Sequence, residues 1–263
     1  MAHNPQFIAQ YGSWALVTGA TEGIGRAFAE SLAGRGLNLI LVARRAEVLQ
    51  ELAASLPRSY GIKVQTVAAD LGVPAQVESV IEACGQVPLG LAVLAAGFGT
   101  SGDLTEIDPA QDLNMVDVNC RAMVQLVHPL SRQLAAQRRG GLILLGSIVG
   151  FQGVARATTY SATKAFVQSL GEGLWHELKP HGVDVLVSAP GPVKTGFLVR
   201  ANMTPGDGVT AQDVAEESLA ALGKRLTVLP GRMSKVLGTS LAFLPRRMRS
   251  QVMKDAMAKM TGR

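Results

Sequence analysis

The chain has 263 residues, of which 48% are apolar and 17% are charged, so it can bury a large core and is not an intrinsically disordered chain. No apolar run reaches the roughly 18 residues that a membrane span needs, and the two cysteines, Cys84 and Cys120, give neither a disulfide framework nor a metal-ligand spacing. The net charge of +5 lies entirely in residues 224–263, which carry a net charge of +9 against −4 in residues 1–223.

Apolar runs alternate with helical patterns along most of the chain. Several runs are continuously apolar, which is typical of strands buried on both faces. The alternation predicts an α/β fold, a doubly wound parallel sheet of six to seven strands with helices on both faces. No repeat or linker interrupts it, so we expect a single domain over residues 1–263. The predicted strands are 14–18, 38–43, 63–70, 91–96, 142–147, 184–190 and a short candidate at 227–230, and the predicted helices are 23–35, 45–58, 74–84, 109–137, 160–178 and 212–223.

The turn after the first predicted strand is rich in glycine. It reads "TGATEGIG" (18–25) and leads into a helical pattern. Gly19 permits a tight turn, Gly23 lets the backbone approach a pyrophosphate, and Gly25 lets the helix pack closely on the sheet. The amides and the positive dipole end of the following helix suit phosphate groups. The pattern predicts a dinucleotide-binding turn.

The end of the second predicted strand indicates which dinucleotide binds. An acid at this place would bond the ribose hydroxyls of NAD, but the strand ends "LVARR" and the next acid is Glu47. The guanidinium groups of Arg44 and Arg45 suit a 2′-phosphate, with Arg44 the stronger candidate because Arg45 is equally explained as a solvated helix-start charge. Glu22, beside the phosphate-binding turn, would repel the 2′-phosphate and therefore disfavours NADP(H). We predict a preference for NADP(H) over NAD(H).

Ser147, Tyr160 and Lys164 follow the apolar run "GLILLG". These are common surface residues, and they either begin an ordinary loop and helix or form an active site. Tyr160 and Lys164 are four residues apart, so they share a helix face. An ammonium beside a phenol favours the phenolate and lowers the pKa of the phenol from about 10.

Taken together, the motifs resemble those of the short-chain dehydrogenase/reductase family in their order and spacing. The stretch 11–45 is particularly similar to hydroxysteroid dehydrogenases and long-chain 3-oxoacyl reductases. One departure is that Leu94 and Ala95 stand where the family usually has two asparagines, so the contacts of those amides are not expected. The matching motifs are "TGATEGIG" (18–25), "DL" (70–71), "AAG" (95–97), Asn119 in "DVNCRA", Ser147, "YSATK" (160–164) and "PGPVKT" (190–195).

The resemblance implies a Rossmann-type catalytic fold and roles for single residues. Tyr160 gives a proton to a carbonyl oxygen, with its pKa lowered by Lys164, which also holds the nicotinamide ribose. Ser147 orients the substrate oxygen, and Asn119 positions a water that links Lys164 to solvent. Asp70 contacts adenine, caps the next helix, or does both. The expected cofactor-binding residues are Gly19, Thr21, Glu22, Gly23, Ile24, Gly25, Arg44, Arg45, Asp70, Leu71, Ala96, Gly97, Tyr160, Lys164, Pro190, Gly191, Val193 and Thr195.

These residues favour an NADPH-dependent oxidoreductase that reversibly reduces a ketone to a secondary alcohol. We expect substrate contacts from residues 98–103, from 149–156 and from the stretch after Thr195. The first two are small and lean apolar and 197–204 is mixed, so we expect an apolar or amphipathic ketone. The alternative is a catalytically silent protein that senses dinucleotides on the same scaffold. The presence of Ser147, Tyr160 and Lys164 argues against that alternative.

The basic C-terminal segment, at about 224–263, raises the question of partners. Phe243 is its only aromatic residue, which argues against stacking on nucleic acid, and Pro245 argues against a membrane-bound helix. We expect a cytoplasmic homodimer or homotetramer. The segment should fold back near the substrate mouth or a subunit seam and bury its apolar residues. Its exposed Arg246, Arg247 and Arg249 then either attract an anionic substrate or form only a solubilising rim.

Overall fold

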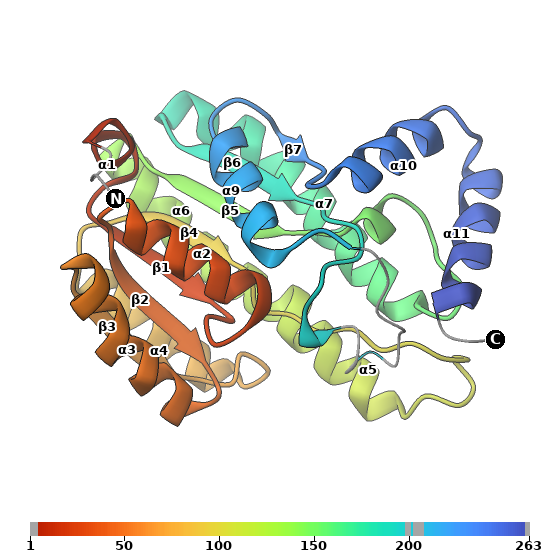
Figure 1. Ribbon diagram of the computed structural model, residues 1–263, viewed down its shortest axis with the longest axis horizontal. Coiled ribbons are helices and arrows are strands. Elements are labelled where there is room, and N and C mark those ends of the chain that lie inside the picture. The colour runs from red at the N-terminus through yellow and green to blue at the C-terminus, as the bar shows by residue number, and fades with distance from the viewer. Residues whose placement is uncertain (1–4, 198–200, 202–207, 261–263) are drawn as a thin grey trace.

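The computed structural model, which describes residues 5–197, 201 and 208–260, has one parallel sheet of seven strands. The order β3-β2-β1-β4-β5-β6-β7 means that the winding reverses between β1 and β4. The predicted doubly wound α/β fold is confirmed (Figure 1). The strands are β1 (Trp14–Thr18), β2 (Asn38–Ala43), β3 (Val64–Ala68), β4 (Leu89–Leu94), β5 (Gly141–Leu145), β6 (Asp184–Ser188) and β7 (Thr227–Val228).

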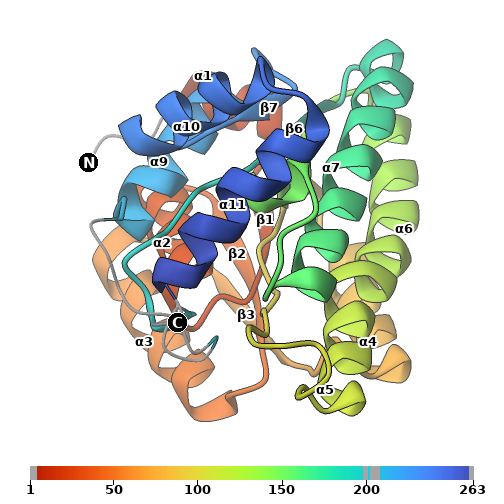
Figure 2. The same cartoon turned by 90° about the vertical axis from the view of Figure 1, so that its right-hand side faces the viewer.

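Helices cover both faces of the sheet. Figure 2 shows α2, α3 and α9 on one face and α4, α6 and α7 on the other, with α11 crossing between the two groups. The helices are α1 (Pro5–Tyr11), α2 (Gly23–Gly34), α3 (Ala46–Tyr60), α4 (Pro74–Gly85), α5 (Pro109–Val116), α6 (Ala122–Gln137), α7 (Thr158–Leu178), α9 (Ala211–Ala221), α10 (Arg232–Ala242) and α11 (Arg246–Met260), with a π turn η1 (Asp117–Arg121) and two 3₁₀ turns, η2 (Ile148–Phe151) and η3 (Lys179–His181).

The core lies on both faces of the sheet. Every residue of β1 and β4 is buried, which explains why these strands are continuously apolar in the sequence. Phe28 and Leu32 of α2 pack on one face, and Leu126 of α6 and Val167 of α7 pack on the other. The central strands are therefore held from both sides.

A third apolar cluster lies beyond the carboxyl ends of the strands. It joins Tyr160 of α7 and Ile148 of η2 to Leu241 of α10 and to Met253 and Met257 of α11. The C-terminal segment therefore folds back over the end of the sheet where the predicted site residues lie.

In the C-terminal segment Pro245 separates two distinct helices, as expected, because a proline cannot continue the hydrogen-bonding of α10. The segment departs from its prediction at two residues. Phe243, expected to be buried, is 85% exposed. Arg249, expected to be exposed, is half-buried and donates hydrogen bonds to the carbonyls of Ala242 and Leu244 at the end of α10. Arg246 and Arg247 are exposed, as expected.

Two further differences concern the helices. The long helix predicted over 109–137 is interrupted by the π turn η1, which holds Asn119. The helix α1 was not predicted, and its Tyr11 donates a 2.9 Å hydrogen bond to the carboxylate of Asp184. Within the described part of the chain, no helix is long and apolar enough to cross a membrane.

Two glycines of α7 test how tightly this helix packs on the sheet. A Cβ at Gly171 would lie 2.2 Å from a methyl group of Val187 in β6, whereas a Cβ at Gly173 would have no neighbour within 4 Å. We predict that Gly171→Ala lowers the free energy of unfolding by about 1–3 kcal/mol, because the packed layers must shift. Gly173→Ala should raise it by about 0.5–1 kcal/mol through helix propensity. Urea denaturation measures both, and equal effects of the two changes would contradict this packing.

Candidate active site

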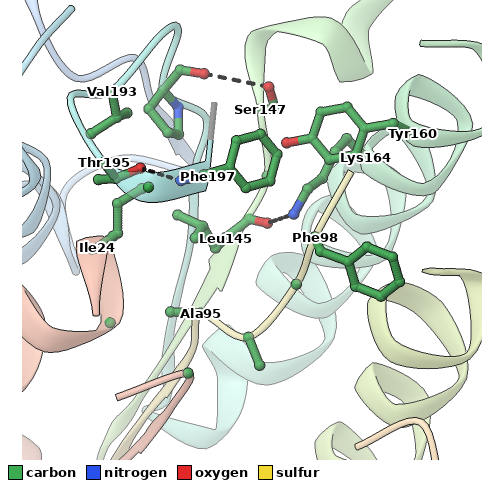
Figure 3. Close-up of a pocket in the computed structure, with 18 of the residues that line it drawn as sticks. Ile24, Ala95, Phe98, Leu145, Ser147, Tyr160, Lys164, Val193, Thr195 and Phe197 are labelled. Carbon is green, nitrogen blue, oxygen red and sulfur yellow. Dashed lines mark hydrogen bonds between the residues drawn. The ribbon is translucent and has the colours of Figure 1, made fainter. Parts of the chain in front are cut away.

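A cavity of about 750 Å³ opens at the carboxyl edge of the sheet. It runs from the start of α2, past the ends of β4 and β5, to α11. Figure 3 shows Ile24 and Thr195 on one side of it and Tyr160 and Lys164 on the other. Of the predicted catalytic and cofactor residues, all but Asn119 line this cavity.

The glycine turn is shaped by close backbone contacts. Gly19 has φ +69°, and a Cβ there would lie 3.0 Å from the Cα of Ala96. A Cβ at Gly25 would lie 2.2 Å from the carbonyl oxygen of Gly19, so the helix comes as close to the strand end as glycine allows. The side chain of Glu22, at the N-cap of α2, makes no capping hydrogen bond. The first amides of α2 therefore face the cavity without a side-chain cap, which fits the phosphates of a dinucleotide.

Arg44 and Arg45 differ in their contacts. The guanidinium of Arg45 pairs with the carboxylate of Glu22 at 3.0 Å and donates a 3.1 Å hydrogen bond to the hydroxyl of Thr21. Arg44 is exposed at the rim of the cavity and has no polar partner in the part of the chain that the structure describes. Arg45 thus offsets the charge of Glu22, and the guanidinium of Arg44 remains available for a ligand.

Asp70 and Leu71 line the cavity beside the ends of β2 and β3. The carboxylate of Asp70 accepts a 2.9 Å hydrogen bond from the amide of Gly72, within its own turn. The prediction that Asp70 caps the next helix is wrong, because α4 begins after Val73. The carboxylate instead fixes the turn that follows β3.

Ser147 and Tyr160 meet at the centre of the site. Ser147 lies just after β5, where its hydroxyl oxygen accepts a hydrogen bond of 3.4 Å from the amide of Val149 at the start of η2. Tyr160 is in the first turn of α7, and its ring lies 5.6 Å from the ring of Phe197, centroid to centroid. Figure 3 shows the phenol oxygen of Tyr160 facing the hydroxyl of Ser147.

Lys164 and Asn119 lie close to this pair and are held by hydrogen bonds to the backbone. The ammonium of Lys164 donates a 2.8 Å hydrogen bond to the carbonyl of Leu145 and lies 5.7 Å from the centroid of the Tyr160 ring. The amide of Asn119 accepts from the N–H of Phe98 at 3.2 Å and donates to its carbonyl at 2.9 Å. Asn119 therefore fixes the loop after β4, and the water that it was expected to position stays a prediction.

Burial dominates the electrostatics of the site. It raises the pKa of Tyr160 to about 12, although hydrogen bonding with Ser147 acts in the opposite direction. It also lowers the pKa of Lys164 to about 8, because a charged ammonium loses its hydration there. The prediction that Lys164 brings the pKa of Tyr160 below its usual value is wrong for this structure, because the pKa is raised. In this environment desolvation outweighs the hydrogen bonding of Tyr160 with Ser147.

The loop after β6 closes the site from the side of α2. Pro190, Gly191, Val193 and Thr195 line the cavity, as predicted. The amide of Gly191 donates a 2.9 Å hydrogen bond to the hydroxyl of Ser234 in α10. The first C-terminal helix is therefore attached directly to this loop.

Several residues of the site were not predicted. Asp112 of α5 accepts hydrogen bonds from Thr100 at 2.8 Å and from Thr159 at 2.5 Å, and so ties the loop after β4 to the residue before Tyr160. No local signal in the sequence indicates this bridge, because its partners are 12 and 47 residues away. Met253 and Met257 belong to the C-terminal segment, which was expected to bury its apolar residues near the substrate mouth or a subunit seam, and the structure places both in the cavity wall. Ser234 of α10 was not predicted either, whereas Phe197 lies in the stretch after Thr195 that was expected to contact the substrate.

Comparison with known proteins places the chain among dehydrogenases. The sequence model described as short chain dehydrogenase matches residues 13–206. A 7beta-hydroxysteroid dehydrogenase of Clostridium sardiniense is 32% identical over 233 residues, which are 87% of this chain and 89% of that protein. A very-long-chain 3-oxoacyl-CoA reductase of Pyrenophora tritici-repentis is 34% identical over 185 residues, which are 66% of this chain and 53% of that protein. The similarity expected from residues 11–45 is thereby confirmed.

Solved structures give the same result. A structure described as concerning the stereoselectivity of 7beta-hydroxysteroid dehydrogenase aligns with a TM-score of 0.87 and 30% identity, over 94% of this chain and 98% of that one. A short-chain dehydrogenase from Sphingobium yanoikuyae in complex with NADPH aligns with a TM-score of 0.77 and 27% identity, over 89% of this chain and 96% of that one.

The lowered pKa of Lys164 predicts a pH dependence of stability. The pKa is 10.5 for an ordinary lysine and about 8 here, so below pH 8 the folded state holds a buried charge that the unfolded state holds in water. This unfavourable contribution disappears as the pH rises from 8 to 10.5 and both states lose the proton. Relative to wild type, Lys164→Met should therefore lose about 2–3 kcal/mol of unfolding free energy between pH 7 and pH 10.

Urea denaturation at the two pH values measures this change. Lys63→Met, at an exposed lysine, is the control and should show no such difference. A Lys164→Met effect that is the same at pH 7 and pH 10 would show that the ammonium is not destabilised by burial.

Proposed function

Since the chain belongs to the short-chain dehydrogenase family and is an oxidoreductase acting on CH–OH and C=O groups, we propose that it reduces the ketone of an apolar or amphipathic substrate with NADPH, reversibly, and that Tyr160 is the proton donor. The observation that supports this best is the buried phenol of Tyr160, which faces Ser147 inside the cavity that also contains the glycine turn.

The residues present fit a nicotinamide dinucleotide. The amides at the start of α2 would hold its phosphates. Asp70 and Leu71, beside the ends of β2 and β3, would contact its adenosine, and the loop from Pro190 to Thr195 would contact its nicotinamide. The bound cofactor supplies the hydride. The protein's part is to position the substrate carbonyl and to provide the proton.

Tyr160 is suited to give a proton to the substrate oxygen. Since burial raises its pKa to about 12, the phenol carries its proton at neutral pH, which is the form that reduction needs. The hydroxyl of Ser147 would hold the carbonyl oxygen in line with that proton. Lys164, held by the carbonyl of Leu145, would stabilise the phenolate that remains after transfer.

The surroundings of Tyr160 favour an apolar ketone. Phe98, Val149 and Phe197 line the cavity near the phenol, together with Met253 and Met257. Side chains of this kind bury the carbon skeleton of the substrate and exclude water from the reacting atoms. The silent dinucleotide sensor is not favoured, because it would give no reason for this arrangement of Ser147 and Tyr160.

The preference for NADPH rests on Arg44, which is exposed at the cavity rim and has no polar partner among the described residues. The NADPH complex of the Sphingobium relative supports it. A cytoplasmic location, a homodimer or homotetramer and the single-domain organisation stay predictions from the sequence.

We predict that Arg44→Asp lowers kcat/KM with NADPH by about 10- to 100-fold, because a charge-assisted hydrogen bond to the 2′-phosphate is replaced by repulsion. The same change should improve the use of NADH. Steady-state kinetics with both cofactors measures this, and Arg58→Asp on α3, at an exposed arginine outside the cavity, is the control. Equal efficiency of the wild type with NADPH and NADH would refute the assignment.

Tyr160→Phe tests the proposed mechanism. It removes only the phenolic hydroxyl and with it the proton to be donated, so turnover of a ketone should fall by about 10²- to 10⁴-fold while the fold and NADPH binding are retained. A panel of steroid ketones, 3-oxoacyl thioesters and small alkyl or aryl ketones identifies the substrate first. Tyr60→Phe, outside the cavity, should keep full activity. If Tyr160→Phe turns over at the wild-type rate, Tyr160 is not the donor.

A further inference from the structure

The charged residues that line the cavity are unevenly distributed. Glu22, Arg44, Arg45 and Asp70 are at the end where the glycine turn lies, and Lys164 is buried beside Tyr160. Beyond Tyr160, the described lining residues are mostly apolar and include no acid. Lys259 of α11 is the single charged residue among them.

The backbone of α11 is fixed against the rest of the protein. Met253 and Met257 are both buried in the cluster that contains Tyr160. The hydroxyl of Ser250 donates a 2.8 Å hydrogen bond to the carbonyl of Gly153, in the segment between η2 and α7. The start of the helix is attached as well, because Arg249 donates to the carbonyls of Ala242 and Leu244. The position of Lys259 relative to the cavity is therefore set by packing.

Lys259 combines a place in the cavity wall with exposure to solvent. It is exposed, whereas Met257, two residues earlier, is buried, so its side chain lies at the rim of the cavity. It lies about 9 Å along the helix axis from Met253, at 1.5 Å per residue. In the described part of the chain its ammonium has no carboxylate or hydrogen-bonding partner. It is free to bind a group of the ligand.

The position of α11 assigns this ammonium to the substrate and not to the cofactor. Figure 1 shows α11 at the right-hand end of the molecule, away from α2. The same helix contributes Met253 and Met257 to the apolar half of the cavity. A ligand that reaches Lys259 therefore passes along this apolar half.

We propose that Lys259 binds an anionic group at the end of the substrate remote from the reacting carbonyl. The substrate class is then an amphipathic ketone whose carbon skeleton lies between Tyr160 and α11 and which ends in a carboxylate or phosphate. This inference rests on the proposed reduction of a ketone. It names a specificity residue on the C-terminal segment, outside the family's matched motifs.

The test uses a steroid ketone with a side-chain carboxylate and its methyl ester, which differ in the charge and in one methyl group, at saturating NADPH. Lys259→Met should lower kcat/KM for the acid about 5-fold through KM, which corresponds to about 1 kcal/mol for an ion pair at an exposed site. The methyl ester should be unaffected. Lys259→Glu should have a larger effect on the acid, and the wild-type preference for the acid should decline with added salt.

Lys254→Met is the matched control, because Lys254 is an exposed lysine on the same helix that does not line the cavity. It should leave both substrates unchanged. A 3-oxoacyl thioester of coenzyme A is the third substrate. If its kcat/KM depends on Lys259, the anionic group that Lys259 binds is a phosphate instead of a carboxylate. Equal effects of the two lysine changes, equal effects on acid and ester, or a changed KM for NADPH would overturn the proposal.

Direct binding separates this inference from the proposed function. Calorimetric titration of the NADPH-loaded protein with acid and ester measures affinity without turnover. If the wild type reduces neither ketone but binds the acid more tightly in a Lys259-dependent way, the proposed reduction fails and the anion site stands. If it reduces both ketones and Lys259→Met does not affect the binding of either, the anion site fails and the proposed function stands.

Discussion

The reversal of the strand order between β1 and β4 is the constraint on which the whole site depends. The two strands pair in parallel up to Thr18 and Leu94, and the hydroxyl of Thr18 accepts a 3.0 Å hydrogen bond from the amide of Ala96 just beyond. From this seam the chain turns to opposite faces of the sheet. The crevice left between the diverging segments is where an open α/β sheet binds its ligand. Here it is bordered by the glycine turn after β1 and by the loop after β4, which Asn119 fixes.

The chemistry of the site follows from dehydration more than from charge pairing. Tyr160 and Lys164 are both buried, and burial favours the neutral form of each, so the pKa of the phenol rises while the pKa of the ammonium falls. The two shifts move the proton affinities apart, from 10.0 for an ordinary tyrosine and 10.5 for an ordinary lysine to about 12 and about 8, so the phenol holds its proton more tightly than the ammonium does. A donor that keeps its proton at neutral pH, next to a lysine that can stabilise its conjugate base, suits the reduction of a carbonyl.

The C-terminal helices form a part of the molecule that is separate from the sheet but attached to the site. Ser234 of α10 accepts a hydrogen bond from Gly191, and Met253 and Met257 of α11 close the apolar cluster around Tyr160. The loop after β5 and the helix α7 thus carry Ser147, Tyr160 and Lys164, whereas the C-terminal helices form the facing wall of the cavity. Such a division lets the substrate preference change without altering the catalytic residues.

The sequence by itself determined the alternating α/β order, the glycine turn, and the family to which the motifs belong, because these depend on local spacing and on residues that follow strands directly. It also placed Ser147, Tyr160 and Lys164 at one edge, since parallel strands end at the same side of a sheet. Tertiary structure alone decided the contacts between distant segments: the bridge of Asp112, the pairing of Arg45 with Glu22, and the return of α11 over Tyr160. It also decided the direction of the pKa shift of Tyr160, because burial is a property of the packed molecule and no spacing of residues along the chain encodes it.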